Sequence, residues 1–144
     1  MKIAIPKERR TGEARVAASP DTVKKYVQMG FEVQVEAGAG AGASIADQIY
    51  ADAGATIVAD TAGAFAADVV LKVARPTDEE IALLPEGAVL IASLSALTNK
   101  DMVEKLAARK VTAFAMELVP RITRAQSMDI LSSQANLAGY KAVL

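Results

Sequence analysis

The sequence predicts an α/β fold: a mostly parallel sheet of about five or six strands flanked by helices, forming a Rossmann- or flavodoxin-like lobe. Two observations predict it. Short β-branched apolar runs alternate along the chain with longer stretches rich in alanine and charged residues, which is the pattern of strands joined by crossover helices. The 144 residues are also 52% hydrophobic and only 4% aromatic, so the chain can bury a core built from small aliphatic side chains.

The expected strands are short apolar runs bounded by glycine, proline or polar residues. The second strand alternates apolar and polar residues, while the fourth and fifth are almost continuously apolar, as strands covered on both faces are. Pro76 ends the region of the fourth strand. In order, the strands are expected at residues 2–5, 31–36, 56–58, 69–73, 88–93 and 111–115.

The expected helices carry recognisable start and stop signals. Ser19 and Pro20 are an N-cap and a first helical residue, and Gly30 is a stop. Acidic residues at 78–80 suit the first turn of a later helix, where the helix dipole favours negative charge. In order, helices are expected at residues 21–29, about 45–53, from 77 onward, from 99 or 100 to 110, and at 128–144.

The last expected helix continues to residue 144 without a glycine, asparagine or proline to stop it. We therefore expect the chain to be one lobe, residues 1–144, of a longer protein. Its start is too polar for a signal peptide, and the alanine-rich run at 62–74 contains Asp68 and Lys72. These features predict a soluble, cytoplasmic chain that does not itself insert into a membrane.

The composition excludes several classes of function. The chain has no histidine and no cysteine, so it has no disulfide, no Ser-His-Asp or Cys-His pair, and no metal site of histidine or cysteine ligands. Its formal net charge of −1 is no footprint for nucleic acid. We expect no metal, no nucleic acid, and no residue acting as nucleophile or acid–base catalyst.

Three glycines, Gly38, Gly40 and Gly42, follow the second expected strand. A dinucleotide-binding turn needs a third glycine three residues after the second, and residues 43 and 45 are alanine and isoleucine. No Gly-Lys-Ser/Thr follows, so the loop is not a Walker motif either. We interpret it as a flexible connection of small residues.

A second candidate is an anion site formed by Lys7, Arg15 and Lys72. Lys7 and Arg15 follow the first expected strand, at the sheet edge where open parallel sheets bind ligands. Two alternatives remain open. The loop can equally be held by local salt bridges to Glu8 and Glu13, and Lys72, inside an apolar run, can serve function or point from the strand end into solvent.

The richest stretch runs from Pro120 to Gln134. It has two arginines three residues apart, and the helix that follows it carries a stripe of short polar side chains and a separate apolar stripe. Short donors and acceptors suit a carboxamide or ribose, and arginines suit a pyrophosphate. The alternative is a loop packed against another subunit. The polar stripe comprises Asp129, Ser132, Ser133, Asn136 and Tyr140; the apolar stripe comprises Leu131, Ala135, Ala138 and Ala142.

These motifs resemble the alpha subunits of proton-translocating nicotinamide nucleotide transhydrogenases, over all 144 residues. The chain resembles the N-terminal half of domain I, the NAD(H)-binding domain. The marks are Ile5-Pro6-Lys7-Glu8, Glu13 with Arg15-Val16-Ala17, Leu71-Lys72-Val73, Ala96-Leu97-Thr98-Asn99, and the long run from Pro120 to Asp129. That last run separates transhydrogenases from the related alanine dehydrogenases. The latter have a histidine where this chain has Ser95 in Leu94-Ser95-Ala96, and serine does not carry protons near neutral pH.

The resemblance implies that the chain helps to place the nicotinamide of NAD(H) for direct hydride transfer to NADP⁺, with NADP(H) bound on a different domain. In the family, residues matching Arg121, Gln126, Asp129 and Ser132 surround the nicotinamide, and one matching Tyr140 lies nearby. Catalysis there is mostly the positioning of two rings. The candidate cofactor-binding residues are Arg121, Ile122, Thr123, Arg124, Gln126, Asp129, Ser132, Ser133 and Tyr140.

Family domain I is more than twice this length, and its second half carries the glycine-rich dinucleotide turn. We therefore expect the last helix, about 128–144, to lead toward that Rossmann lobe, and the isolated chain to bind NADH weakly or not at all and to be inactive alone. The implied partners are a second domain I in a homodimer and the NADP(H)-binding and membrane domains. The implied location is the cytoplasmic side of the inner membrane, through those partners. Two other hypotheses stay open: a non-catalytic dimerisation or docking lobe, and a lobe of an alanine dehydrogenase-like oxidoreductase using Arg15 and Lys72.

Overall fold

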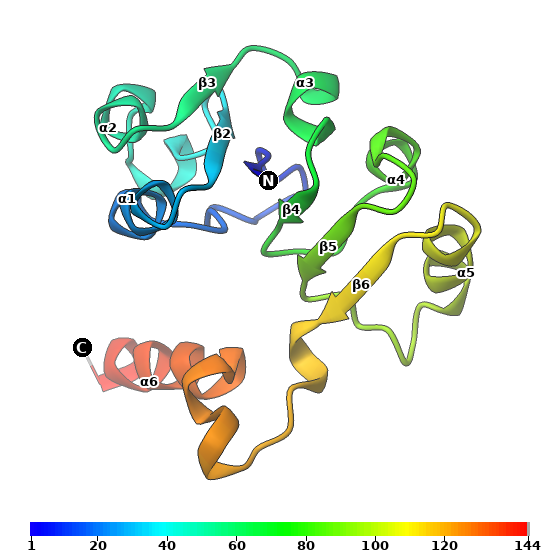
Figure 1. Ribbon diagram of the computed structural model, residues 1–144. Helices are drawn as coiled ribbons and strands as arrows, with labels where there is room; N and C mark the ends of the chain where they lie inside the picture. The colour runs from blue at the N-terminus through cyan, green and yellow to red at the C-terminus, as the bar shows by residue number, and fades with distance from the viewer. Residues whose placement is uncertain (144) are drawn as a thin grey trace.

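The computed structural model describes residues 1–143 and contains one six-stranded sheet with helices on both sides (Figure 1). The strands are β1 (Lys2–Ile5), β2 (Glu32–Glu36), β3 (Thr56–Val58), β4 (Val69–Leu71), β5 (Val89–Ala92) and β6 (Thr112–Ala115). The α-helices are α1 (Pro20–Gln28), α2 (Asp47–Asp52), α3 (Thr61–Phe65), α4 (Asp78–Leu83), α5 (Lys100–Ala108) and α6 (Ile130–Val143). Three short 3-10 helices are η1 (Ala41–Ala43), η2 (Met116–Leu118) and η3 (Thr123–Met128).

The sheet has the order β3-β2-β1-β4-β5-β6, and every pair of neighbours is parallel. Ile3 pairs with Val33 of β2 on one side and with Val69 of β4 on the other. The expected parallel α/β fold is therefore confirmed. Because all strands run the same way, the loops after β1, β4 and β5 meet at one edge, and the strand order reverses between β1 and β4, where such folds bind ligands.

Two apolar clusters cover the two faces of the sheet. On the face of α1 and α2, Ile5, Val33 and Val35 pack with Val23 and Tyr50. On the face of α3, α4 and α5, strand residues such as Val70 and Leu90 form the second cluster, with Phe65, Leu84 and Leu106 among its helix and loop residues. The alternation of side chains along each strand assigns successive residues to opposite faces.

Local capping residues begin the helices as the sequence predicts. The side chain of Ser19 accepts a hydrogen bond from the Thr22 amide, with Pro20 at the first helical position. Thr77 and Glu80 form a reciprocal capping box at the start of α4. Gly30 has a φ of 87° after α1, in the left-handed region that favours glycine.

Three sequence expectations are wrong in detail. Helix α3 was not expected, because its five residues give no helical periodicity and have a glycine at their centre; the Asp60 side chain caps it by accepting from the Gly63 amide. The fourth strand ends at Leu71, before Lys72. The last helix begins at Ile130 instead of residue 128, because η3 occupies Thr123–Met128.

Candidate functional site

A hollow of about 600 Å³ lies at the carboxyl edge of the sheet, against the first turns of α6. The loop after β1 contributes Arg15, the strand ends contribute Lys72 and Ser93, and α6 with the residue before it contributes Asp129, Ser133 and Gln134. We call it the α6 hollow. In this hollow the sheet edge meets the polar start of the last helix, so most of the sequence candidates can be judged against it.

Asp129 is the buried centre of the helix start. One carboxylate oxygen accepts from the backbone amides of Leu131 (2.9 Å) and Ser132 (3.3 Å), and the other accepts from the Ser132 hydroxyl (2.6 Å). The Ser133 hydroxyl donates to the Asp129 carbonyl at 3.0 Å. The hydrogen bonds from the side chain and backbone of Ser132 lower the pKa of Asp129, and the positive charge of Arg121 lowers it further. Asp129 therefore caps α6 and fixes two of the candidate serines.

The remaining candidates in this stretch are exposed. Tyr140 is 70% exposed and lies far along α6. The apolar stripe that begins at Leu131 also has no cover within residues 1–143, and Leu131 itself is 55% exposed. The expectation that this stripe packs against the same chain is therefore wrong. The candidates whose side chains lie open at the surface are Arg121, Ile122, Thr123, Arg124, Gln126 and Tyr140.

Lys72 is buried between two carboxylates. Its Nζ lies 3.2 Å from Glu8 Oε2 and 3.0 Å from Glu80 Oε1, and all three side chains are at most 3% exposed. Glu8 also accepts from the amides of Val73 and Ala74. The interpretation that Lys72 points into solvent is thus wrong, since its ammonium group is neutralised inside the protein.

Arg15 lies at the surface, in the loop after β1. Its Nε and Nη2 donate to the two carboxylate oxygens of Glu13 at 2.8 and 2.7 Å, and its Nη1 donates to Gln134 Oε1 at 3.1 Å. The hydrogen bond from Arg15 lowers the pKa of Glu13. The local salt bridge to Glu13 is therefore present, while Glu8 pairs with Lys72 instead of with this loop.

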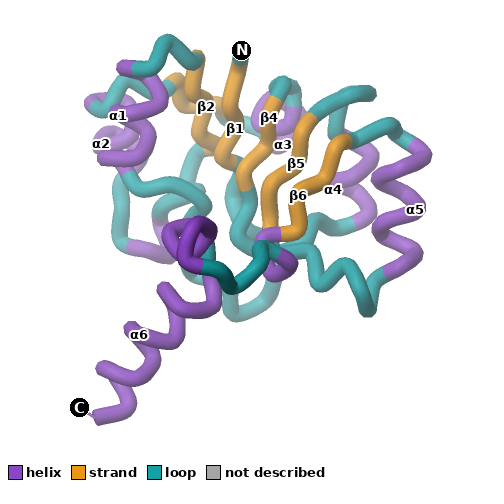
Figure 2. The backbone as a smooth tube through the Cα atoms, turned by 60° about the horizontal axis from the view of Figure 1, so that its bottom comes forward, coloured by secondary structure: helices purple, strands orange, loops and turns teal. Residues whose placement is uncertain are grey.

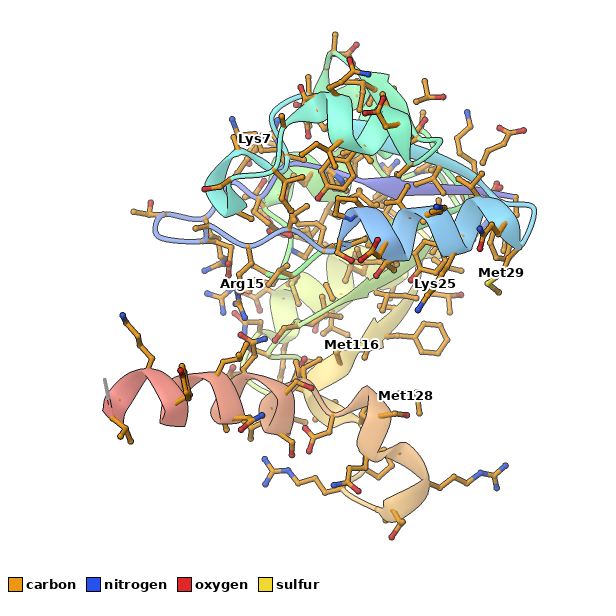
Figure 3. The ribbon with its side chains drawn as sticks, turned by 90° about the vertical axis from the view of Figure 1, so that its left-hand side faces the viewer. Lys7, Arg15, Lys25, Met29, Met116 and Met128 are labelled. Carbon is orange, nitrogen blue, oxygen red and sulfur yellow. The ribbon has the colours of Figure 1, made fainter. Side chains whose placement is uncertain are left out.

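The three members of the expected anion site are not brought together. Figure 3 shows Lys7 on the opposite side of Arg15 from α6. Lys7 lies close to the Gly38 loop, Arg15 is held by Glu13 and Gln134, and Lys72 by Glu8 and Glu80. The arrangement within residues 1–143 fits structural ion pairs better than one shared anion site.

The glycine loop is closely packed instead of flexible. A Cβ added at Gly40 would lie 2.6 Å from the Ile45 carbonyl oxygen, and one at Gly42 would lie 2.7 Å from that of Ala14. The Gly38 amide donates to the carboxylate of Asp47. This loop therefore uses its glycines for close backbone contact, and the amide that a phosphate would need already has an acceptor.

Two polar clusters were not expected from the sequence. Glu36, at the end of β2, accepts from the Arg9 guanidinium, from the Lys7 amide and from Thr61. Burial raises the pKa of Glu36, but these hydrogen bonds outweigh it and lower the pKa overall. A glutamate closing a buried strand was the available signal. Glu117, in η2, accepts from the amides of Leu94 and Ala96, and no local pattern reveals that contact.

Comparisons with known proteins agree with this geometry. The family described as alanine dehydrogenase/PNT, N-terminal domain, matches residues 4–138. The chain is 63% identical to the first of the polypeptides that make up the NAD(P) transhydrogenase alpha subunit of Rhodospirillum rubrum, over all of this chain and 39% of that protein. The crystal structure of transhydrogenase from Sinorhizobium meliloti aligns with a TM-score of 0.95 and 52% identity, covering 99% of this chain and 43% of that one.

An L-alanine dehydrogenase structure aligns less closely, with a TM-score of 0.80 and 36% identity over 83% of this chain and 33% of that one. The order of the two alignments follows the motif evidence, which favours the transhydrogenase branch. The chain spans less than half the length of each of these relatives. The resemblance seen in the motifs is confirmed: the chain belongs to the family of alanine dehydrogenase/PNT N-terminal domains.

Proposed function

We propose that this chain forms the N-terminal lobe of a transhydrogenase NAD(H)-binding domain and holds the nicotinamide end of the cofactor in the α6 hollow. The observation that carries the proposal is the start of α6, where Asp129 fixes Ser132 and Ser133 beside a hollow of about 600 Å³. The 63% identity to a transhydrogenase alpha subunit supports it over the whole chain. The second lobe of such a domain would bind the rest of the dinucleotide.

The donor set of this site fits a carboxamide. A carboxamide needs a hydrogen-bond donor for its oxygen and acceptors for its nitrogen. The serine hydroxyls and the Gln134 side chain at the hollow offer both kinds of group, and the Asp129 carboxylate accepts only. The exposed candidates from Arg121 to Gln126 lie on the same surface segment, where arginines suit the pyrophosphate.

NADH supplies the hydride in this reaction, and NADP⁺ on another domain accepts it. The contribution of this chain is to hold one ring in an orientation from which transfer is direct, which can account for a large part of a rate enhancement. Asp129 orients the serines, and the hollow reduces the access of water. No acid or base is needed, which suits a chain without histidine.

We also propose the assembly that this role requires: a homodimer of the NAD(H)-binding domain, associated with NADP(H)-binding and membrane-embedded partners on the cytoplasmic side of the membrane. Within residues 1–143, no helix has the length and apolar character to cross a membrane. The uncovered side chains of Leu131 and Leu137, 55% and 63% exposed, support burial of α6 against further protein.

The test uses the complete alpha subunit with its NADP(H)-binding partner. Arg121→Ala and Asp129→Asn should each slow hydride transfer at least tenfold, because each removes a group from the nicotinamide end of the site. Arg109→Ala is a matched control, since Arg109 donates to the Leu84 carbonyl on the opposite side of the sheet. Unchanged transfer rates in both test variants would contradict the proposed function.

A further inference from the structure

Glu117 holds the turn that follows β5. Its carboxylate accepts from the amide of Leu94 at 2.9 Å and from the amide of Ala96 at 3.0 Å, across more than 20 residues of sequence. Between them, Ser95 has a φ of 51°, in the left-handed region that non-glycine residues rarely adopt. The carbonyl of Ser95 accepts from the Thr98 amide and hydroxyl and from the Asn99 side chain.

This turn has few other sources of stability. Ser95 itself is exposed, and a side chain in the left-handed region carries a conformational cost that the surroundings must offset. Two hydrogen bonds to a single carboxylate are strong because the acceptor is charged. Burial raises the pKa of Glu117, but the backbone amides it binds outweigh that effect and lower the pKa overall, as expected for a carboxylate that works in its charged form.

Glu117 also links this turn to the candidate site. It lies in η2 (Met116–Leu118), and α6 contacts η2. Met116 lines the α6 hollow together with Asp129 and Ser133. The polar contact from Arg15 to Gln134 ties α6 directly to the loop after β1. Glu117 therefore anchors the short segment on which the start of α6 rests.

We propose that Glu117 is a positioning residue for the nicotinamide end of the site: by gripping the 94–96 turn, its carboxylate sets where η2, and hence the start of α6, lies against the sheet edge. This rests on the function proposed above. Glu117 need not touch the cofactor. Its effect passes through η2 to Asp129 and the serines that Asp129 orients.

The test compares Glu117→Gln with the matched control Glu104→Gln in the complete alpha subunit. Glutamine keeps the size of the side chain but offers one acceptor oxygen, and its amide group would face a backbone N–H. Glu104 is exposed on α5. We expect Glu117→Gln to speed amide exchange at residues 93–97, measured by hydrogen–deuterium exchange mass spectrometry. We also expect a single-turnover hydride transfer rate about tenfold lower, with unchanged amplitude.

Glu117→Asp provides a second arm. Aspartate keeps both oxygens and the charge but is one methylene shorter, so its transfer rate should fall between those of the wild type and Glu117→Gln. A merely structural role predicts a lower amplitude with an unchanged rate, because fewer molecules would be folded. That result, or an unchanged rate despite faster exchange at 93–97, would overturn the positioning role. The separate failure of Arg121→Ala and Asp129→Asn to slow transfer would instead remove the proposed function, and the exchange result would still report whether Glu117 holds the turn.

Discussion

The body of the protein, residues 1–115, and the arm, residues 120–143, are built in different ways. In the body, apolar clusters cover both faces of the sheet and even a lysine is buried with its partners. In the arm, Ala125 and Asp129 are the only buried residues among those the structure describes. Figure 2 shows α6 extending away from the rest of the chain.

The difference teaches where each region obtains its stability. Buried apolar surface stabilises the body at about 25 cal/mol per Å². A helix of 14 residues with no buried face is marginal in water when it stands alone. The arm therefore depends on a few polar contacts at its base: the Asp129 cap, the contact with η2 and the hydrogen bond from Arg15 to Gln134. The proposed site lies where these two kinds of structure meet.

The largest expected effect comes from breaking the buried charge cluster of the body. Lys72→Met should lower the free energy of unfolding by about 3–5 kcal/mol, because it leaves the Glu8 and Glu80 carboxylates buried without their cation. Urea unfolding at neutral pH measures this. Lys24→Met, at an exposed position on α1, is the matched control and should change stability by less than about 0.5 kcal/mol. An equally small change for Lys72→Met would show that this cluster is not important for the stability of the body.

A second change tests the other buried carboxylate of the body, Glu36. Arg9→Gln should cost about 1–3 kcal/mol at pH 7, because Glu36 loses a charged donor while it stays buried. The pKa of Glu36 is lowered in the folded protein. Its contribution is therefore present above the unfolded pKa of about 4.3 and is lost as pH falls through the lower folded pKa.

The expected signature is thus a stability difference between wild type and Arg9→Gln that is full at pH 7 and closes toward pH 3. Urea unfolding at both pH values measures it. Arg10→Gln, one residue further along the same exposed loop, should show little difference at either pH. A gap that stays constant down to pH 3 would mean that Arg9 stabilises the body by packing instead of by charge.

The contrast between the two regions also explains what the sequence could predict. Strand runs, the Ser19 cap and the Thr77–Glu80 capping box are local signals, so the six strands and most helices of the body could be located from them. The burial of Lys72 could not, because Glu8 lies 64 residues before it and only the fold brings them together.

The candidate site follows the same rule. The polar stripe from Asp129 was visible because it repeats at helical spacing. The contacts that place it were not, because the hydrogen bond from Arg15 to Gln134 spans 119 residues and those of Glu117 span 21 and 23. The sequence could therefore indicate which residues form the site but not which residues position them.

The smallest expected effect on stability tests the arm. Arg15 is 53% exposed at its side chain, and exposed ion pairs contribute about 0–1 kcal/mol. Arg15→Gln should therefore change the free energy of unfolding by less than about 1 kcal/mol. It should nevertheless speed amide exchange at residues 131–137, because the direct polar tie between α6 and the loop after β1 is weakened. Hydrogen–deuterium exchange of wild type and variant measures both regions in one experiment, with exchange in β1 and β5 as the internal reference. If α6 and the β-strands lost protection together, the arm would belong to the cooperative unit of the body, and the distinction drawn from burial would not hold.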